Sequence, residues 1–162
     1  MIYLIKNYKK KTSDQNSWYP YLSDILKNDY NQNFDELDIS YNEYGKPLLG
    51  AVHFSVTHTD HELAIVISDN EVGIDMEEVR KYEPLVAKKL FTDKEQALVK
   101  DNDYLFTRVF VMKEAYGKYD GRGLGEYLKE IEVGEIDNLE TFDYDNLIMA
   151  VCNSNNNEIK EL

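Results

Sequence analysis

Apolar and β-branched residues gather in short segments that predict β-strands. Some segments alternate apolar and polar residues, and others are short apolar runs, as expected for strands that are half or fully buried. The predicted strands span residues 1–5, 51–58, 63–68, 71–75, 131–136, 141–144 and 147–152.

Between these strands, apolar residues recur at helical spacing in residues 18–28, 91–100 and 104–119. Thr92, followed by Glu95 three positions later, predicts a capping box at the start of the second helix. Three glycines in residues 120–125 predict the end of the third helix.

The order of these elements predicts an α+β fold, because strands, two helices and further strands follow one another without the strict alternation of a doubly wound sheet. We expect a single domain, residues 1–162, with halves at about 1–70 and 71–162. Each half offers antiparallel strands and a helix, so two pseudo-symmetric halves are a conjecture that no sequence repeat proves. No glycine-rich phosphate loop follows a predicted strand, which excludes the usual nucleotide-binding architectures.

Composition narrows the function. The chain of 162 residues is 43% hydrophobic, enough for one core, and its net charge of −13 argues against sequence-general binding to nucleic acid. The first residues contain too short an apolar run for a signal peptide or a membrane span, which predicts a cytoplasmic protein. Cys152 is the single cysteine, and we expect it to be a buried packing residue.

The segment EVGIDMEEVRK, residues 71–81, places acidic residues at the end of a predicted buried strand. Side chains alternate along a strand, so Asp75 and Glu77 project to one side and Met76 to the other. At about 4 Å and an effective dielectric near 20, two carboxylates repel by roughly 4 kcal/mol, so a cation or a shared proton is expected between them. The alternative is a solvated strand end whose acids diverge into water.

The third predicted helix carries Glu114 and Lys118 on the continuation of an apolar stripe that includes Phe106 and Phe110. A surface ion pair between Glu114 and Lys118 would contribute only about 0.3 to 0.5 kcal/mol, which hardly requires an inward stripe. Three carboxylates with a nearby lysine suit a hard divalent ion, such as magnesium, bound to a substrate phosphate.

Histidines at positions 53, 58 and 61 invite a zinc interpretation. His53 and His58 differ by an odd number, so they face opposite sides of one strand, which disfavours zinc. Thr57 and His58 at the end of that strand are better suited to phosphate oxygens, although a buried structural histidine is an open alternative.

Five short motifs occur in order from Tyr44 to Leu124, about half of the chain: YGKP, FSVTHT, VGIDMEEV, LFTDKEQ and FVMKEAYGKYDGRGL. Together they resemble the 4′-phosphopantetheinyl transferases, most closely the type that activates peptide synthetases. The spacing of G-I-D-x-E and the later K-E-A-x-x-K, together with their order, makes the resemblance specific.

The resemblance implies a set of site residues. Asp75, Glu77 and Glu114 would hold magnesium or manganese, and Lys118 would contact the diphosphate of coenzyme A. His58 and Thr57 would meet its phosphates. The resemblance further implies that the coenzyme site includes Gly45, Lys46 and Pro47, which would border the adenine, as well as Asp75 and Lys113. Glu95 matches a recurrent family glutamate, so a site role competes with its capping role.

The implied reaction transfers 4′-phosphopantetheine from coenzyme A to a serine of an acyl or peptidyl carrier protein and releases adenosine 3′,5′-bisphosphate. Glu114 is the candidate base, with Glu77 or water as alternatives, and Glu114 and Lys118 are the candidate catalytic residues. The partners are a carrier protein and coenzyme A, without nucleic acid or membrane, and the two-half type implies a monomer. The rival functions are a degenerate binding module for coenzyme A or a carrier, and a magnesium-dependent nuclease.

The sequence departs from the family in two respects. About 44 residues precede GKP, and the arginine-rich helix of larger members is missing, so Lys9, Lys10 and Lys11 are candidates to replace it at the 3′-phosphate. The acidic chain must also meet acidic carriers, which slows encounter unless a local patch offsets the charge. The candidates for such a patch are Lys88, Lys89 and Lys94.

Overall fold

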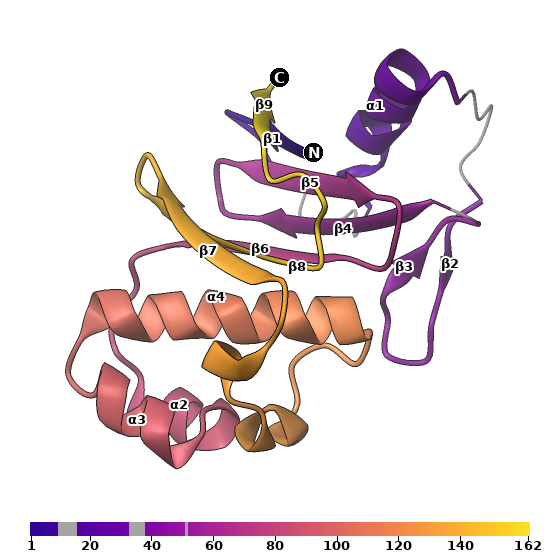
Figure 1. Ribbon diagram of the computed structural model, residues 1–162. Helices are drawn as coiled ribbons and strands as arrows, with labels where there is room; N and C mark the ends of the chain where they lie inside the picture. Colours follow the sequence, from indigo (N-terminus) through magenta and orange to yellow (C-terminus); the bar gives the residue numbers. More distant parts are fainter. Residues whose placement is uncertain (10–15, 33–37, 51) are drawn as a thin grey trace.

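The computed structural model describes residues 1–9, 16–32, 38–50 and 52–162 (Figure 1). Lys10 and Lys11, two of the candidates for the 3′-phosphate, lie outside these residues. The strands are β1 (Ile2–Ile5), β2 (Ser40–Tyr41), β3 (Pro47–Leu48), β4 (His53–His58), β5 (Leu63–Ser68), β6 (Gly73–Glu78), β7 (Leu139–Tyr144), β8 (Leu147–Cys152) and β9 (Ile159–Glu161). The helices are α1 (Tyr19–Tyr30), α2 (Pro84–Leu90), α3 (Asp93–Val99) and α4 (Asp103–Asp120), with 3₁₀ turns η1 (Glu126–Glu130) and η2 (Val133–Glu135).

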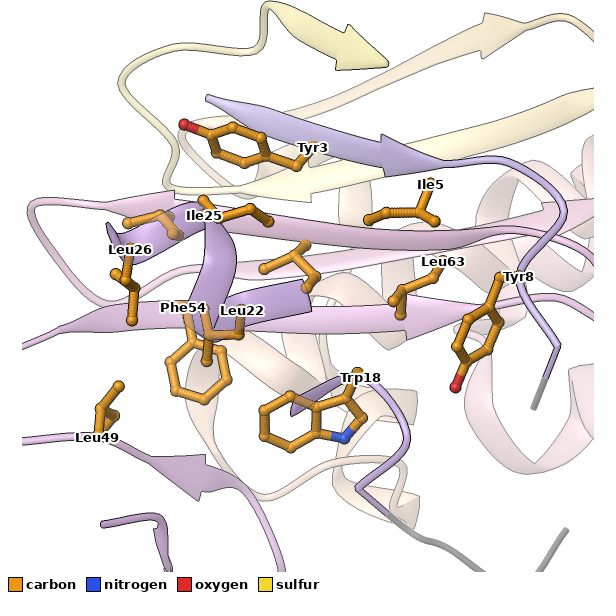
Figure 2. Close-up of a cluster of buried hydrophobic side chains, with 12 residues drawn as sticks. Tyr3, Ile5, Tyr8, Trp18, Leu22, Ile25, Leu26, Leu49, Phe54 and Leu63 are labelled. Atoms are coloured by element: carbon orange, nitrogen blue, oxygen red, sulfur yellow. The ribbon is translucent and has the colours of Figure 1, made fainter. Parts of the chain in front are cut away.

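The first sheet has the order β4-β5-β1-β9. Strands β4, β5 and β1 pair antiparallel, and β9 returns from the C-terminal end of the chain to pair parallel with β1. Helix α1 covers one face of this sheet, where Trp18, Leu22 and Leu26 pack with Phe54 and Leu63 (Figure 2). Most of the exposed α1 residues are polar, namely Asp24, Lys27, Asn28 and Asp29, as expected for an amphipathic helix.

The second sheet has the order β6-β8-β7, and all its strands pair antiparallel. One face packs against the first sheet through a buried cluster that includes Ile2, Leu4, Ile74 and Met76. The other face packs against α4 (Figure 1) through an apolar cluster of Val111, Ala115, Ile148 and Ala150. The resulting order of layers is helix, sheet, sheet, helix. Helices α2 and α3 pack against the outer side of α4 (Figure 1).

The α+β prediction is confirmed, and so are the three predicted helices. Each predicted strand outside residues 131–136 overlaps an observed strand, and residue 51, the first of the predicted strand 51–58, lies outside the described residues. The strand over 131–136 is wrong, because these residues form η2 and its flanks. Side chains rather than a neighbouring strand bind their backbone groups: Lys113 Nζ donates to the Ile131 carbonyl, and Glu95 Oε1 accepts from the Val133 amide at 2.8 Å. Helix α2, the β2–β3 hairpin and β9 are additional elements.

A capping box at the start of α3 and a close contact at Gly73 stabilise the region from β6 to α4. The capping box is confirmed, because Thr92 Oγ1 accepts from the Glu95 amide at 3.1 Å and Glu95 Oε2 accepts from the Thr92 amide at 2.9 Å. Gly73 lets β6 approach α4 closely, since a Cβ at this position would lie 2.0 Å from the Ala115 carbonyl oxygen. This approach places the residues after Gly73 directly against the face of α4 that carries Glu114.

Within the described residues, we find no helix with the length and apolar character needed to cross a bilayer.

Candidate functional site

A cleft of about 440 Å³ lies where β4, β6 and the C-terminal part of α4 meet. The turn at residues 44–47 and the loop at residues 121–123 contribute to its walls. It is lined by most of the site residues expected from the sequence: Gly45, Lys46, Pro47, Thr57, His58, Asp75, Glu77, Glu114 and Lys118. Segments far apart in the chain therefore come together at a single cleft.

Asp75 is the central charged residue of the cleft, and its side chain is only 5% exposed. Its Oδ1 atom accepts a hydrogen bond from Thr57 Oγ1 at 2.8 Å and forms an ion pair with Lys118 Nζ at 2.7 Å. Its Oδ2 atom is buried and has no hydrogen-bond partner among the described residues. A buried charged oxygen without a partner is costly, so this atom marks a position where a donor or a cation would be stabilised.

The neighbouring acids show the effect of burial first and of nearby negative charge second. Burial raises the pKa of the Glu114 carboxyl to about 7, and the Asp75 and Glu77 carboxylates contribute, while Lys118 opposes the rise. Burial, followed by repulsion from Asp75, also raises the pKa of Glu77. The solvated strand end considered from the sequence is therefore excluded for Asp75, and the acids share one partly desolvated region.

Helix α4 positions Glu114 and Lys118 on one face, one turn apart, and brings both to the cleft. It ends where Gly121 adopts a left-handed conformation, with φ of 89°. The loop then folds back on the helix, since a Cβ at Gly117 would lie 2.6 Å from the Gly123 carbonyl oxygen. This close return makes residues 121–123 part of the cleft wall.

Asn42 anchors the turn that forms the opposite wall. Its Oδ1 accepts hydrogen bonds from the amides of Tyr44 and Lys46, both at 2.9 Å. Its Nδ2 donates to the Gly121 carbonyl at 2.8 Å, so the turn is tied to the end of α4. Gly45 has φ of 86°, a conformation that favours glycine at this position.

Lys46 reaches from this turn to two acceptors. Its Nζ pairs with Glu71 and donates to the Tyr119 carbonyl at 3.3 Å. Glu71 also accepts from His53 Nδ1 at 3.2 Å. These two contacts leave one of the three N–H donors of Lys46 for an anion in the cleft.

Lys113 is the exception among the expected site residues. It is fully buried on another side of α4, where its Nζ pairs with Glu95 Oε2 at 2.7 Å and donates to the Leu128 carbonyl at 2.8 Å. Lys113 does not line the cleft, so we replace its assignment to coenzyme binding with a structural one. The same contacts favour the capping and ion-pair role of Glu95 over a site role.

His58 lines the cleft, and its ring lies 6.1 Å from that of Tyr8, between centroids. Across the described ranges, three or more His, Cys, Asp or Glu side chains are nowhere gathered closely enough to hold a metal ion as they stand. In their present positions, Asp75, Glu77 and Glu114 therefore do not form a three-carboxylate metal site.

The sequence interpretation missed Asn42 and Trp18 as parts of the site. Asn42 stands just before a turn that contains Gly45 and Pro47, a position at which asparagine often bonds to nearby backbone amides, so this signal was available. Trp18 lines the cleft from the start of α1, and no spacing rule connects it to the distant residues that line the other walls.

Comparisons with known proteins agree with this geometry. The sequence model of the ACPS family, described as the 4′-phosphopantetheinyl transferase superfamily, matches residues 71–146. The chain is 27% identical over 118 residues to the 4′-phosphopantetheinyl transferase ffp of Bacillus subtilis and 28% identical over 117 residues to Sfp of Bacillus subtilis strain 168; each alignment covers 67% of this chain and 52% of the relative. It is also 32% identical over 89 residues to the 4′-phosphopantetheinyl transferase gsp of Aneurinibacillus migulanus, covering 51% of this chain and 38% of the relative.

The chain thus spans about half the length of the curated relatives it matches. The matched region contains β6, α4 and the acidic residues of the cleft, which are the elements that build the site. Over residues 71–146, the chain is similar to the 4′-phosphopantetheinyl transferase superfamily.

Proposed function

We propose that this protein is a 4′-phosphopantetheinyl transferase that moves 4′-phosphopantetheine from coenzyme A to a serine of an acyl or peptidyl carrier protein, as in the type that activates peptide synthetases. The observation that carries the proposal is the buried Asp75, paired with Lys118 in a cleft that Glu114 also lines. The names of the relatives supply the reaction class.

Coenzyme A fits the distribution of groups along the cleft. Gly45, Lys46 and Pro47 would border the adenine, and Thr57 and His58 would face the phosphates at the end of β4. Lys118 would bind the diphosphate, because a mobile ammonium group at the end of a helix can follow charge as it moves between phosphate oxygens. Lys9 is the described member of the N-terminal lysines expected at the 3′-phosphate, and it stays a prediction.

In the proposed reaction, the serine oxygen forms a bond to the β-phosphorus of coenzyme A. The bond from that phosphorus to the bridging oxygen breaks, so adenosine 3′,5′-bisphosphate leaves. The serine proton passes to the Glu114 carboxylate, the candidate general base. Lys118 would stabilise the negative charge that grows on the leaving group, which favours the transition state over the ground state. Glu77 or water is the alternative base.

The donor set suits magnesium or manganese. Asp75, Glu77 and Glu114 supply hard carboxylate oxygens, and the unpartnered Oδ2 of Asp75 identifies where a cation would be stabilised. When bound, the ion would neutralise charge on the diphosphate. These three residues would hold it, with Asp75 as the buried member.

A basic segment supports the carrier protein as the partner. Residues 80–94 contain five Lys and Arg residues against two acidic ones, whereas the whole chain has a net charge of −13. Leu85 in the same segment is 83% exposed. A local positive and apolar surface would offset the repulsion between two acidic proteins during encounter.

We further propose that the two halves are pseudo-symmetric and that the protein acts as a cytoplasmic monomer. Each half runs from a strand through a helix to a hairpin whose second strand pairs antiparallel with the first strand: β1, α1, β4 and β5 in one, and β6, α4, β7 and β8 in the other. A cleft between two halves of one chain needs no second subunit. Light scattering should therefore give the monomer mass, and an obligate trimer would contradict the proposal.

The decisive test is mass spectrometry of carrier proteins after incubation with coenzyme A, magnesium and this protein. We expect a serine-linked gain of one phosphopantetheine, which Asp75→Ala abolishes. Binding of coenzyme A without any modified serine would indicate a degenerate binding module instead. Cleavage of DNA or RNA by the wild type, lost in Asp75→Ala, would indicate the nuclease alternative.

A further inference from the structure

Lys118 holds one oxygen of the Asp75 carboxylate, directly beside the oxygen at which a cation would be stabilised, so the two positive charges would repel each other. Its Nζ lies 2.7 Å from Oδ1, which also accepts from Thr57 Oγ1 at 2.8 Å. The other oxygen, Oδ2, is buried without a partner among the described residues. One carboxylate thus has an oxygen with two donors beside an oxygen with none, so the distribution of donors is uneven.

The lysine is well placed to leave this position. Its side chain is 27% exposed, whereas that of Asp75 is 5% exposed, so solvent reaches the lysine but hardly the acid. A lysine has a long flexible stem and a point charge that can be transferred between acceptors without a fixed geometry. Movement therefore costs Lys118 little, provided that another positive charge takes its place at Asp75.

The surrounding charge favours such an exchange. Asp75, Glu77 and Glu114 line the same cleft, and the lysine paired with Asp75 there is Lys118. Lys118, and Arg80 with its Nη1 3.8 Å from Glu77 Oε1, supply two positive charges against these three carboxylates. A divalent ion at Asp75 would therefore improve the balance of charge more than an ammonium group does.

We propose that Lys118 and a divalent cation compete for Asp75, so that cation binding displaces Lys118 from Oδ1 and releases its ammonium group into the cleft. The released lysine then binds a phosphate group of the substrate. Only the identity of that phosphate, the diphosphate of coenzyme A, rests on the proposed function. If cation binding raises the affinity for a phosphate ligand by releasing Lys118, then linkage requires that the phosphate ligand raise the affinity for the cation by the same factor.

The first test measures cation binding by isothermal titration with manganese or magnesium chloride, without coenzyme or carrier. Lys118→Gln should bind the cation roughly five- to tenfold more tightly than the wild type, because the competitor has been removed. The matched control is Lys46→Gln, which removes the same charge from the same cleft but from a lysine paired with Glu71. Its cation affinity should change by less than about twofold, within the range of a screened charge.

The second test needs no variant. An amine-reactive acetylating reagent, followed by peptide mass spectrometry, reports how exposed each lysine is with and without manganese. Acetylation of Lys118 should increase when manganese is added, since its Nζ leaves Asp75. Lys46 serves as the internal reference and should not change, because its contacts are with Glu71 and Tyr119.

Equal or weaker cation binding in Lys118→Gln, or an acetylation rate of Lys118 that manganese leaves unchanged or lowers, would overturn the exchange. A rise in affinity of the same size in Lys46→Gln would also overturn it, because general charge removal would then explain the result. Neither measurement uses carrier modification. If Lys118 and the cation compete but the protein modifies no carrier, only the proposed function is refuted. If the protein modifies a carrier but Lys118 and the cation do not compete, only the exchange is refuted.

Discussion

Lys113 and Glu95 form a buried ion pair, with 2.7 Å between Nζ and Oε2, away from the cleft that the neighbouring residue Glu114 lines. Burial lowers the pKa of Lys113, and the bond to Glu95 opposes this effect. The lysine also donates to the carbonyls of Leu128 and Ile131, so it joins α4 to the segment that follows it. Adjacent residues of one helix thus serve different purposes, stability at Lys113 and the candidate site at Glu114.

Removing one member of this pair should be strongly destabilising. Lys113→Met would leave the Glu95 charge buried without its partner, and we expect the free energy of unfolding in urea to fall by about 3 to 5 kcal/mol. The double variant Glu95→Gln/Lys113→Met should lose less than the sum of the single variants. Coenzyme A affinity of the folded fraction should stay near the wild-type value. A specific loss of affinity at full folding would restore the coenzyme role predicted from the sequence.

Gly73→Ala should loosen the contact between β6 and α4. The added Cβ would lie 2.0 Å from the Ala115 carbonyl oxygen, so the strand and helix must separate, and we expect a loss of about 2 to 3 kcal/mol in unfolding free energy. Gly134→Ala is the matched control, because its Cβ would meet no atom within 4 Å. If calorimetry gave both variants the same melting temperature, the prediction would be wrong, because β6 and α4 could then separate at little energetic cost.

Glu114→Gln and Lys118→Ala should separate chemistry from binding. Glu114→Gln keeps the size of the side chain and removes its basicity, so carrier modification should slow by about 100-fold or more, with a smaller change in coenzyme A affinity. Lys118→Ala should weaken coenzyme A binding and also slow transfer. Titration calorimetry beside a modification rate assay gives both quantities. Near-normal turnover of Glu114→Gln would move the base to Glu77 or to water.

The raised pKa of Glu114 should make stability depend on pH. The folded carboxyl has a pKa of about 7, against 4.5 as its ordinary value, so the folded state binds more protons between these values. Stability must therefore fall as pH rises from 4.5 to about 7, and the loss from Glu114 is on the order of 2 kcal/mol. In urea unfolding without divalent ions, the free energy of unfolding of Glu114→Gln should rise relative to that of the wild type as the pH increases across this range. The control is Glu78→Gln, which removes an exposed charge from the end of β6, and an equal gain in stability there would reject the assignment to Glu114.

Glu71 should weaken coenzyme A binding, because its carboxylate holds the Lys46 ammonium group and adds negative charge near the cleft. Glu71→Gln should tighten coenzyme A binding by roughly two- to fivefold, as expected for release of a partly exposed ion pair. Glu140→Gln, which changes an exposed acid bonded to Asn157, controls for net charge. Weaker binding by Glu71→Gln would mean that Glu71 instead holds Lys46 in a useful orientation.

Local patterns in the sequence account for the α+β class, the positions of α1, α3 and α4, and the acidic end of β6. The helical repeat around Phe106 and Phe110, the capping box of Thr92, and the alternation that turns Asp75 away from Met76 are such patterns. Their physical causes lie within a few residues, so spacing alone reveals them. The family motifs are likewise short runs of fixed spacing, which is why the resemblance is visible in the sequence itself.

The partners of these residues, by contrast, depend on tertiary packing. The apolar pattern of residues 131–136 suits a strand, but the side chains of Lys113 and Glu95 bind its backbone groups instead. Lys113 and Glu114 are adjacent in the sequence and belong to one motif, yet successive helical residues point about 100° apart, so one meets Glu95 and the other the cleft. The pairing of Asp75 with Thr57 and Lys118 joins residues 18 and 43 positions away. Contacts at such separations depend on how strands and helices pack, and no local pattern specifies them.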